Sequence, residues 1–148
     1  EMSGHIFYNY EYYGYDDAIY ASLKLIRILN NTKKTLDELI SVYMQSSSTP
    51  EIKLYCDEKI KFSLLDKIVE DIPKHYDSGA NLITIDGVRL ETENFWFLLR
   101  ASNTQNCIVF RLEHFVKDKF KEELIKLISI LESYSLDIKE LTSFNQTV

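Results

Sequence analysis

Residues 88–99 read Val-Arg-Leu-Glu-Thr-Glu-Asn-Phe-Trp-Phe-Leu-Leu, and this stretch decides the fold class. Its two ends, Val88–Thr92 and Phe95–Leu99, are rich in β-branched and aromatic residues, which favour strands. Between them stands Glu93-Asn94, a pair that forms turns readily. The pattern predicts a β-hairpin.

Further strands extend this hairpin in both directions. Leu82–Ile85 precedes it through the turn-forming pair Asp86-Gly87, and Cys107–Glu113 follows it. These runs predict four strands in one antiparallel sheet. A separate strand is expected at Glu51–Cys56.

Helices are predicted on either side of the sheet residues. Asp57 can cap a helix whose apolar residues face a core, and apolar residues from Phe120 to Leu131 recur at clear helical spacing. A polar tail is expected from Ser133. Strand, helix, consecutive strands and helix is the order of an α+β domain, here an antiparallel four-stranded sheet with two helices on one face.

The N-terminal residues have a helical pattern instead. Ile19, Leu23 and Ile26 recur at helical spacing and form an apolar stripe suited to burial. Asp16 or Asp17 can cap the start of this helix, because a carboxylate accepts from the free amides of the first turn.

A second, shorter helix and a domain boundary follow. Thr35 and Glu38 stand at capping-box spacing. Residues 46–50, Ser-Ser-Ser-Thr-Pro, have the composition of a linker. We therefore expect two parts: residues 1–46, which are mainly helical, and residues 47–148, which form the α+β domain.

Composition excludes several classes of protein. The net charge of −6 and the pI near 5.1 disfavour a nucleic-acid partner, because such affinity depends on Lys and Arg neutralising phosphates. No apolar run is long enough for a membrane span, and no secretory signal opens the chain. Cys56 and Cys107 form no CxxC pair, which favours a reduced, cytoplasmic protein.

Most sequence signatures of active sites are absent. The 4 glycines form neither a P-loop nor a dinucleotide-binding motif, and the 3 histidines, His5, His75 and His114, lack partners at metal-ligand spacing. No protein-encoded metal site is expected.

One loop between two predicted strands could bind an anion. It reads Arg100-Ala101-Ser102-Asn103-Thr104-Gln105 and combines a guanidinium, two hydroxyls, an amide and the backbone amides of a turn. The alternative is a solvated hairpin in which the Ser, Asn and Thr only cap the turn. Spacing alone favours the solvated hairpin, because such side chains are the usual turn residues.

Two motifs resemble one enzyme family. Arg100–Thr104 looks like the phosphate-binding loop of the last domain of bacterial phosphomannomutase/phosphoglucomutases, and residues 1–5, Glu-Met-Ser-Gly-His, look like the sugar-binding loop of domain 3. The likeness extends from Glu1 to about Leu131. It also includes residues 14–21, 48–52 and 85–89.

The resemblance implies a role for each matching residue. Arg100, Ser102, Asn103 and Thr104 would hold the substrate phosphate that is not being transferred. Glu1 and Ser3 would bind the 3- and 4-hydroxyls of the sugar, and His5 would line the same cleft. For the last three residues the alternatives are a frayed chain end and a partly buried polar histidine.

The resemblance also implies what the chain lacks. In the family, a phosphoserine of domain 1 exchanges phosphate with the sugar, and aspartates of domain 2 hold Mg²⁺. We therefore expect no catalytic or metal residue in this chain. Domain 3 would end at residue 46, and residues 47–148 would form domain 4, whose fold resembles the TATA-box-binding protein.

The favoured interpretation is the C-terminal fragment of a cytoplasmic phosphohexomutase that interconverts hexose 1-phosphate and 6-phosphate. The fragment would bind mannose or glucose phosphate, need domains 1–3 for activity, and be inactive alone. A free-standing phosphosugar-binding or interaction module without catalysis is the alternative. A structural domain whose loop is incidental is a third possibility.

Overall fold

Two units make up the chain in the computed structural model, Glu1–Met44 and Gln45–Val148. The structure describes residues 4–76 and 79–148. No helix among these residues is long and apolar enough to cross a bilayer.

The first unit contains α1 (Ala18–Thr32) and α2 (Leu36–Ile40), and η1 (Ser41–Gln45) follows them. Asp17 caps α1 by accepting a hydrogen bond from the N–H of Tyr20 at 2.9 Å. Thr35 and Glu38 form the predicted capping box of α2. Both helix starts therefore follow local sequence chemistry.

The apolar stripe of α1, which the sequence pattern makes suited to burial, is exposed within its unit. Ile19, Leu23 and Ile26 are 76%, 59% and 60% exposed, and no residue of α1 is buried. A helix buries a stripe only against another layer of structure. The short elements described in this unit do not form such a layer.

The second unit is built on a six-stranded sheet in the order β1-β6-β5-β4-β3, with β2 also paired to β6. Every pairing is antiparallel. The strands are β1 (Ser47–Ser48), β2 (Ile52–Tyr55), β3 (Asn81–Ile83), β4 (Val88–Glu91), β5 (Phe95–Ala101) and β6 (Cys107–His114).

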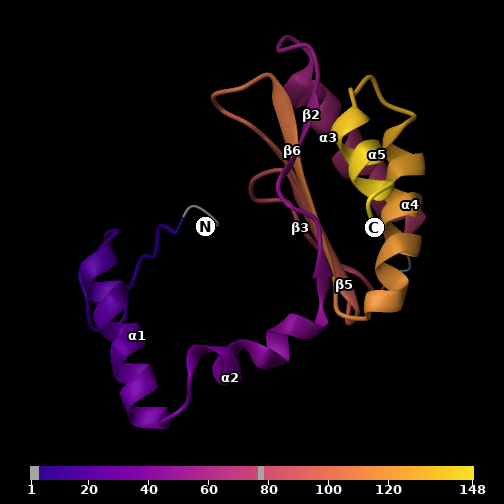
Figure 1. The fold of residues 1–148 in the computed structure, drawn as a ribbon. Helices are drawn as coiled ribbons and strands as arrows, with labels where there is room; N and C mark the ends of the chain where they lie inside the picture. The colour runs from indigo at the N-terminus through magenta and orange to yellow at the C-terminus, as the bar shows by residue number, and fades with distance from the viewer. Residues whose placement is uncertain (1–3, 77–78) are drawn as a thin grey trace. The chain divides into compact units, whose positions relative to one another are not determined.

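Helices cover one face of this sheet, as predicted for an α+β domain (Figure 1). They are α3 (Lys61–Asp71), which continues into η2 (Ile72–His75), α4 (Lys117–Leu131) and α5 (Lys139–Asn145). Two details differ from the prediction. The described part of the sheet has six strands instead of four, and the expected polar tail contains α5, whose Leu141 is fully buried.

The Ser-rich stretch belongs to the sheet, although its composition is that of a linker. Ser47 and Ser48 pair with His114 and Glu113. The Thr49 N–H donates to the Leu112 carbonyl at 2.9 Å, and the Thr49 hydroxyl oxygen accepts from the Leu112 N–H at 3.0 Å. A side chain thus completes the ladder beside Pro50, which has no N–H.

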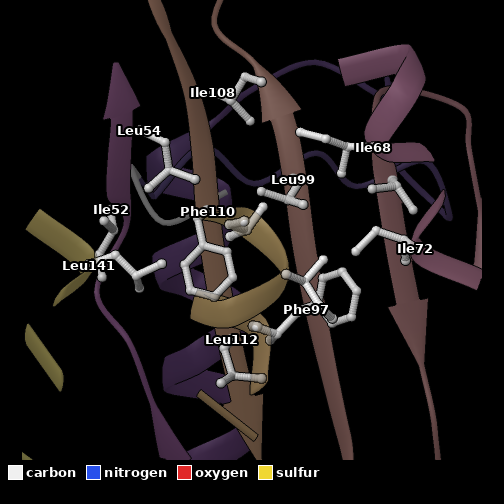
Figure 2. Close-up of a cluster of buried hydrophobic side chains, with 14 of the residues drawn as sticks. Ile52, Leu54, Ile68, Ile72, Phe97, Leu99, Ile108, Phe110, Leu112 and Leu141 are labelled. Carbon is white, nitrogen blue, oxygen red and sulfur yellow. The ribbon is translucent and has the colours of Figure 1, made fainter. Parts of the chain in front are cut away.

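A hydrophobic core lies between the sheet and its helices (Figure 2). Burial alternates strictly along β5: Phe95, Phe97, Leu99 and Ala101 are buried in the core, whereas Arg100 is exposed. The labelled core residues are Ile52, Leu54, Ile68, Ile72, Phe97, Leu99, Ile108, Phe110, Leu112 and Leu141.

The start of α3 differs from the prediction. The helix begins at Lys61, and its cap residue Ile60 makes no side-chain capping bond. Asp57 instead accepts a hydrogen bond from the Lys59 N–H at 2.9 Å, in the turn before the helix.

Candidate functional site

The predicted phosphate-binding residues lie together at one end of the β5–β6 hairpin. The two strands are in register, with Arg100 opposite Val109, and the Ser102 N–H donates to the Cys107 carbonyl at 3.0 Å where the loop begins. Asn103 and Thr104 are exposed. The hairpin therefore presents its polar loop to solvent from two strands inside the sheet.

Ser102 caps the turn, as the solvated-hairpin interpretation expects. Its hydroxyl oxygen accepts hydrogen bonds from the N–H groups of Thr104 at 3.4 Å and Gln105 at 3.1 Å. A hydroxyl also carries one proton that it can donate. Ser102 can thus shape the loop and donate to an anion at the same time.

Arg100 is held only weakly by other side chains. Its Nη1 lies 3.8 Å from Oδ2 of Asp86, and the two side chains are 46% and 64% exposed. Ion pairs of this kind in solvent contribute little, about 0–1 kcal/mol. The guanidinium is therefore available to a phosphate, which it can bind through two parallel hydrogen bonds.

The backbone at Leu99 and Arg100 is in close contact with the β3–β4 turn. Gly87 has a φ of +82°, and a Cβ at this position would lie 2.1 Å from the Leu99 carbonyl oxygen and 3.0 Å from the Arg100 Cα. Only glycine fits both the backbone angle and the space. This turn positions the strand residue that carries the guanidinium.

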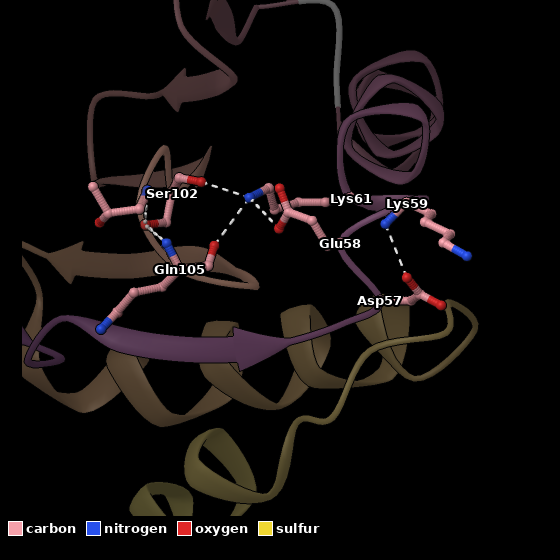
Figure 3. A network of polar contacts seen from close by, with 7 residues as sticks. Asp57, Glu58, Lys59, Lys61, Ser102 and Gln105 are labelled. Carbon is pink, nitrogen blue, oxygen red and sulfur yellow. Dashed lines mark hydrogen bonds and ion pairs between the residues drawn. The ribbon is translucent and has the colours of Figure 1, made fainter.

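Lys61 is a residue of this site that the sequence analysis missed (Figure 3). Its side chain is 1% exposed, and its Nζ donates to the carbonyls of Ser102 at 2.7 Å and Gln105 at 3.0 Å, and to Oε2 of Glu58 at 2.8 Å. The loop and Lys61 are far apart in the sequence. One lysine at a helix start carries no local signal that would indicate this contact.

The predicted sugar-binding residues belong to the first unit. Glu1 and Ser3 lie outside the described residues. His5 is exposed, and its Nδ1 contacts Oδ2 of Asp16, whose Oδ1 accepts from the Ile6 N–H at 3.2 Å. The hydrogen bond from His5 lowers the pKa of Asp16 below its usual value. Asp16 therefore holds His5 in place and is not the helix cap.

A magnesium site does not fit the described residues. Among residues 4–76 and 79–148, no three His, Cys, Asp or Glu side chains come together as a ligand set. Mg²⁺ prefers several oxygen ligands, usually including carboxylates.

Family profiles match both units of the chain. Residues 1–46 match the phosphoglucomutase/phosphomannomutase alpha/beta/alpha domain III, and residues 51–126 match the phosphoglucomutase/phosphomannomutase C-terminal domain. The chain belongs to the phosphoglucomutase/phosphomannomutase family. It corresponds to a C-terminal part of such a protein.

Individual relatives agree with this assignment. A phosphomannomutase/phosphoglucomutase of Pseudomonas putida is 40% identical over 135 residues, which cover 86% of this chain and 28% of that protein. A phosphoglucomutase of Neisseria gonorrhoeae is 36% identical over 118 residues, covering 76% and 24%. The chain thus spans about a quarter of the length of these relatives.

The fold is also similar to that of a solved structure. A phosphoglucomutase/phosphomannomutase family protein from Burkholderia thailandensis matches with a TM-score of 0.70 and 30% sequence identity, over 93% of this chain and 29% of that one. The α+β fold class predicted from the strand and helix order is confirmed.

Proposed function

We propose that this chain binds the phosphate group of a hexose 1- or 6-phosphate within a phosphohexomutase. Arg100, Ser102, Asn103 and Thr104 hold the phosphate that is not transferred. The observation that carries the proposal is one exposed hairpin loop that combines a weakly paired guanidinium with hydroxyl and amide donors. It lies in the segment that matches the family's C-terminal domain.

Recognition of the sugar is assigned to the first unit. Glu1 and Ser3 bind the 3- and 4-hydroxyls, and His5 lines the cleft beside them. The contact between His5 and Asp16 supports this assignment, because it gives an exposed imidazole a defined orientation. The β-bridge between Phe7 and Asp16 brings the two ends of residues 7–16 together.

The complete enzyme interconverts hexose 1- and 6-phosphates and uses parts that other domains provide. We assign the phosphoserine nucleophile and the Mg²⁺ ligands to domains 1 and 2. The exposed apolar stripe of α1 supports a further domain contact, since Ile19, Leu23 and Ile26 are suited to burial. We place the enzyme in the cytoplasm, where the free thiols of Cys56 and Cys107 remain reduced.

A phosphate titration followed by amide chemical shifts tests the proposal. We expect the amides of Ser102, Asn103 and Thr104 to move, with a dissociation constant on the order of 1 mM, about −4 kcal/mol. The binding is weak because the loop is open to solvent and salt, which screen exposed charges.

Variants of Arg100 identify the group that binds phosphate. Arg100→Ala should weaken binding by about tenfold or more, because each hydrogen bond to a charged group contributes roughly 1.5–3 kcal/mol. Arg100→Lys should also weaken it, since an ammonium lacks the planar two-point grip. Arg27→Lys, an exposed site on α1, is the matched control. Unchanged binding in Arg100→Ala would leave the solvated-hairpin interpretation.

A further inference from the structure

Lys61 stands at a position where a lysine is unfavourable for two local reasons. It is the first residue of α3, where a cation faces the positive end of the helix dipole. Its side chain is 1% exposed, although a buried ammonium is costly unless all of its donors are satisfied. Neither position favours a lysine locally, so its contacts must explain its place.

Those contacts satisfy the ammonium. They also connect both sides of the loop Arg100–Gln105, called the anion loop below, to α3. The three N–H donors have three acceptors: the carbonyls of Ser102 and Gln105, and the carboxylate of Glu58. Ser102 opens the loop and Gln105 lies near its end. Figure 3 shows dashed lines from the Lys61 amino group to both of these carbonyls.

We propose that Lys61 is a positioning residue for the anion loop. The inference rests on the proposed function, in which this loop binds the substrate phosphate. By drawing two carbonyl oxygens toward α3, Lys61 keeps them away from the anion, which they would repel. The loop is also ordered before phosphate arrives, so less conformational freedom is lost on binding.

Lys61 acts through the shape of the loop more than through its charge. The Glu58 carboxylate, 2.8 Å from Nζ, offsets the positive charge of the ammonium. Glu58→Gln removes this offset and leaves both carbonyl contacts in place. If charge governs binding, this variant should bind phosphate clearly more tightly than the unchanged chain; if loop shape governs binding, its affinity should stay within about twofold, roughly 0.4 kcal/mol.

Lys61→Met in the full chain is the main test, with inorganic phosphate as the probe. Methionine keeps a long apolar side chain and removes the three donors. We expect phosphate binding to weaken by about tenfold, which is about 1.4 kcal/mol. Lys67→Met, an exposed lysine on the same helix, removes the same charge and should leave binding unchanged.

A measurement without phosphate separates this inference from the proposed function. In the ligand-free Lys61→Met variant, the carbonyl ¹³C shifts of Ser102 and Gln105 should change, and hydrogen exchange at the Gln105 amide should accelerate. If the unchanged chain binds no phosphate, the proposed function fails. If it binds phosphate but Lys61→Met alters neither the loop signals nor the affinity, only the role of Lys61 fails.

The unchanged chain supplies a test that does not depend on the variant folding. Scalar couplings across the hydrogen bonds should connect ¹⁵Nζ of Lys61 with the carbonyl carbons of Ser102 and Gln105. Their absence, with the Lys61 amino group exchanging freely with solvent, would overturn the inference.

Discussion

Gly87→Ala should disturb both the sheet and the anion loop. The new Cβ would lie 2.1 Å from the Leu99 carbonyl oxygen and 3.0 Å from the Arg100 Cα, on a backbone with a φ of +82°. The left-handed backbone costs an alanine roughly 1–2 kcal/mol. Relieving the clash requires β4 and β5 to shift, and such overpacking costs about 1–3 kcal/mol. We therefore expect the free energy of unfolding to fall by about 2–5 kcal/mol.

Urea unfolding followed by the fluorescence of Trp96 measures this loss. Trp96 is the only tryptophan and lies on β5, so its signal reports on the second unit. Gly79→Ala is the matched control, because among the described residues no atom beyond its chain neighbours lies within 4 Å of a Cβ at that position. Phosphate binding should weaken in Gly87→Ala, since the strand bearing Arg100 must move.

A change of less than about 0.5 kcal/mol in Gly87→Ala, the range usual for surface substitutions, would show that the turn does not press on β5. Unchanged phosphate affinity in a destabilised variant would show instead that Arg100 keeps its position despite the strain.

Three further outcomes are expected. Leu141→Ala should lower the free energy of unfolding by about 2–5 kcal/mol, because it empties a fully buried site; a negligible change in urea unfolding would mean that α5 is not part of the core. Burial lowers the pKa of His114, so the unfolded chain gains this proton before the folded chain does as pH falls below about 6.5, and the free energy of unfolding should drop in that range. His114→Gln should flatten this dependence between pH 7.5 and 5.5, and an unaltered slope would contradict the assignment. The purified chain should not convert mannose 6-phosphate to mannose 1-phosphate, even with Mg²⁺ and a sugar bisphosphate, in a coupled assay; reproducible turnover would refute this expectation.

The sheet could be predicted because the residue pattern that defines each strand lies within a short stretch of sequence. Alternating burial along Phe95–Ala101 follows directly from the residue pattern, and the helical spacing from Phe120 to Leu131 corresponds to α4. The capping box at Thr35 could be predicted from the sequence in the same way. Each of these features depends on neighbours within one strand or one or two helical turns.

Features that depend on distant residues could not be read in this way. The hydroxyl of Thr49 completes a ladder with Leu112, and Lys61 binds carbonyls of the loop that follows β5. The α5 helix has weak apolar periodicity, and it is stabilised because Leu141 enters the core. Asp16 and Asp17 look alike as caps, and only the fold assigns one to the helix and the other to His5.

The irregular pairing beside Pro50 has a consequence for association between molecules. An exposed sheet edge with free N–H and carbonyl groups invites another strand to pair with it. Here the edge formed by β1 and β2 is interrupted at the proline, the Tyr55 carbonyl accepts from the Asp137 N–H at 2.8 Å, and the Lys53 N–H donates to Glu140 at 3.4 Å. The opposite edge, β3, has only 3 residues. Neither edge offers a long template, so the arrangement disfavours edge-to-edge pairing between molecules.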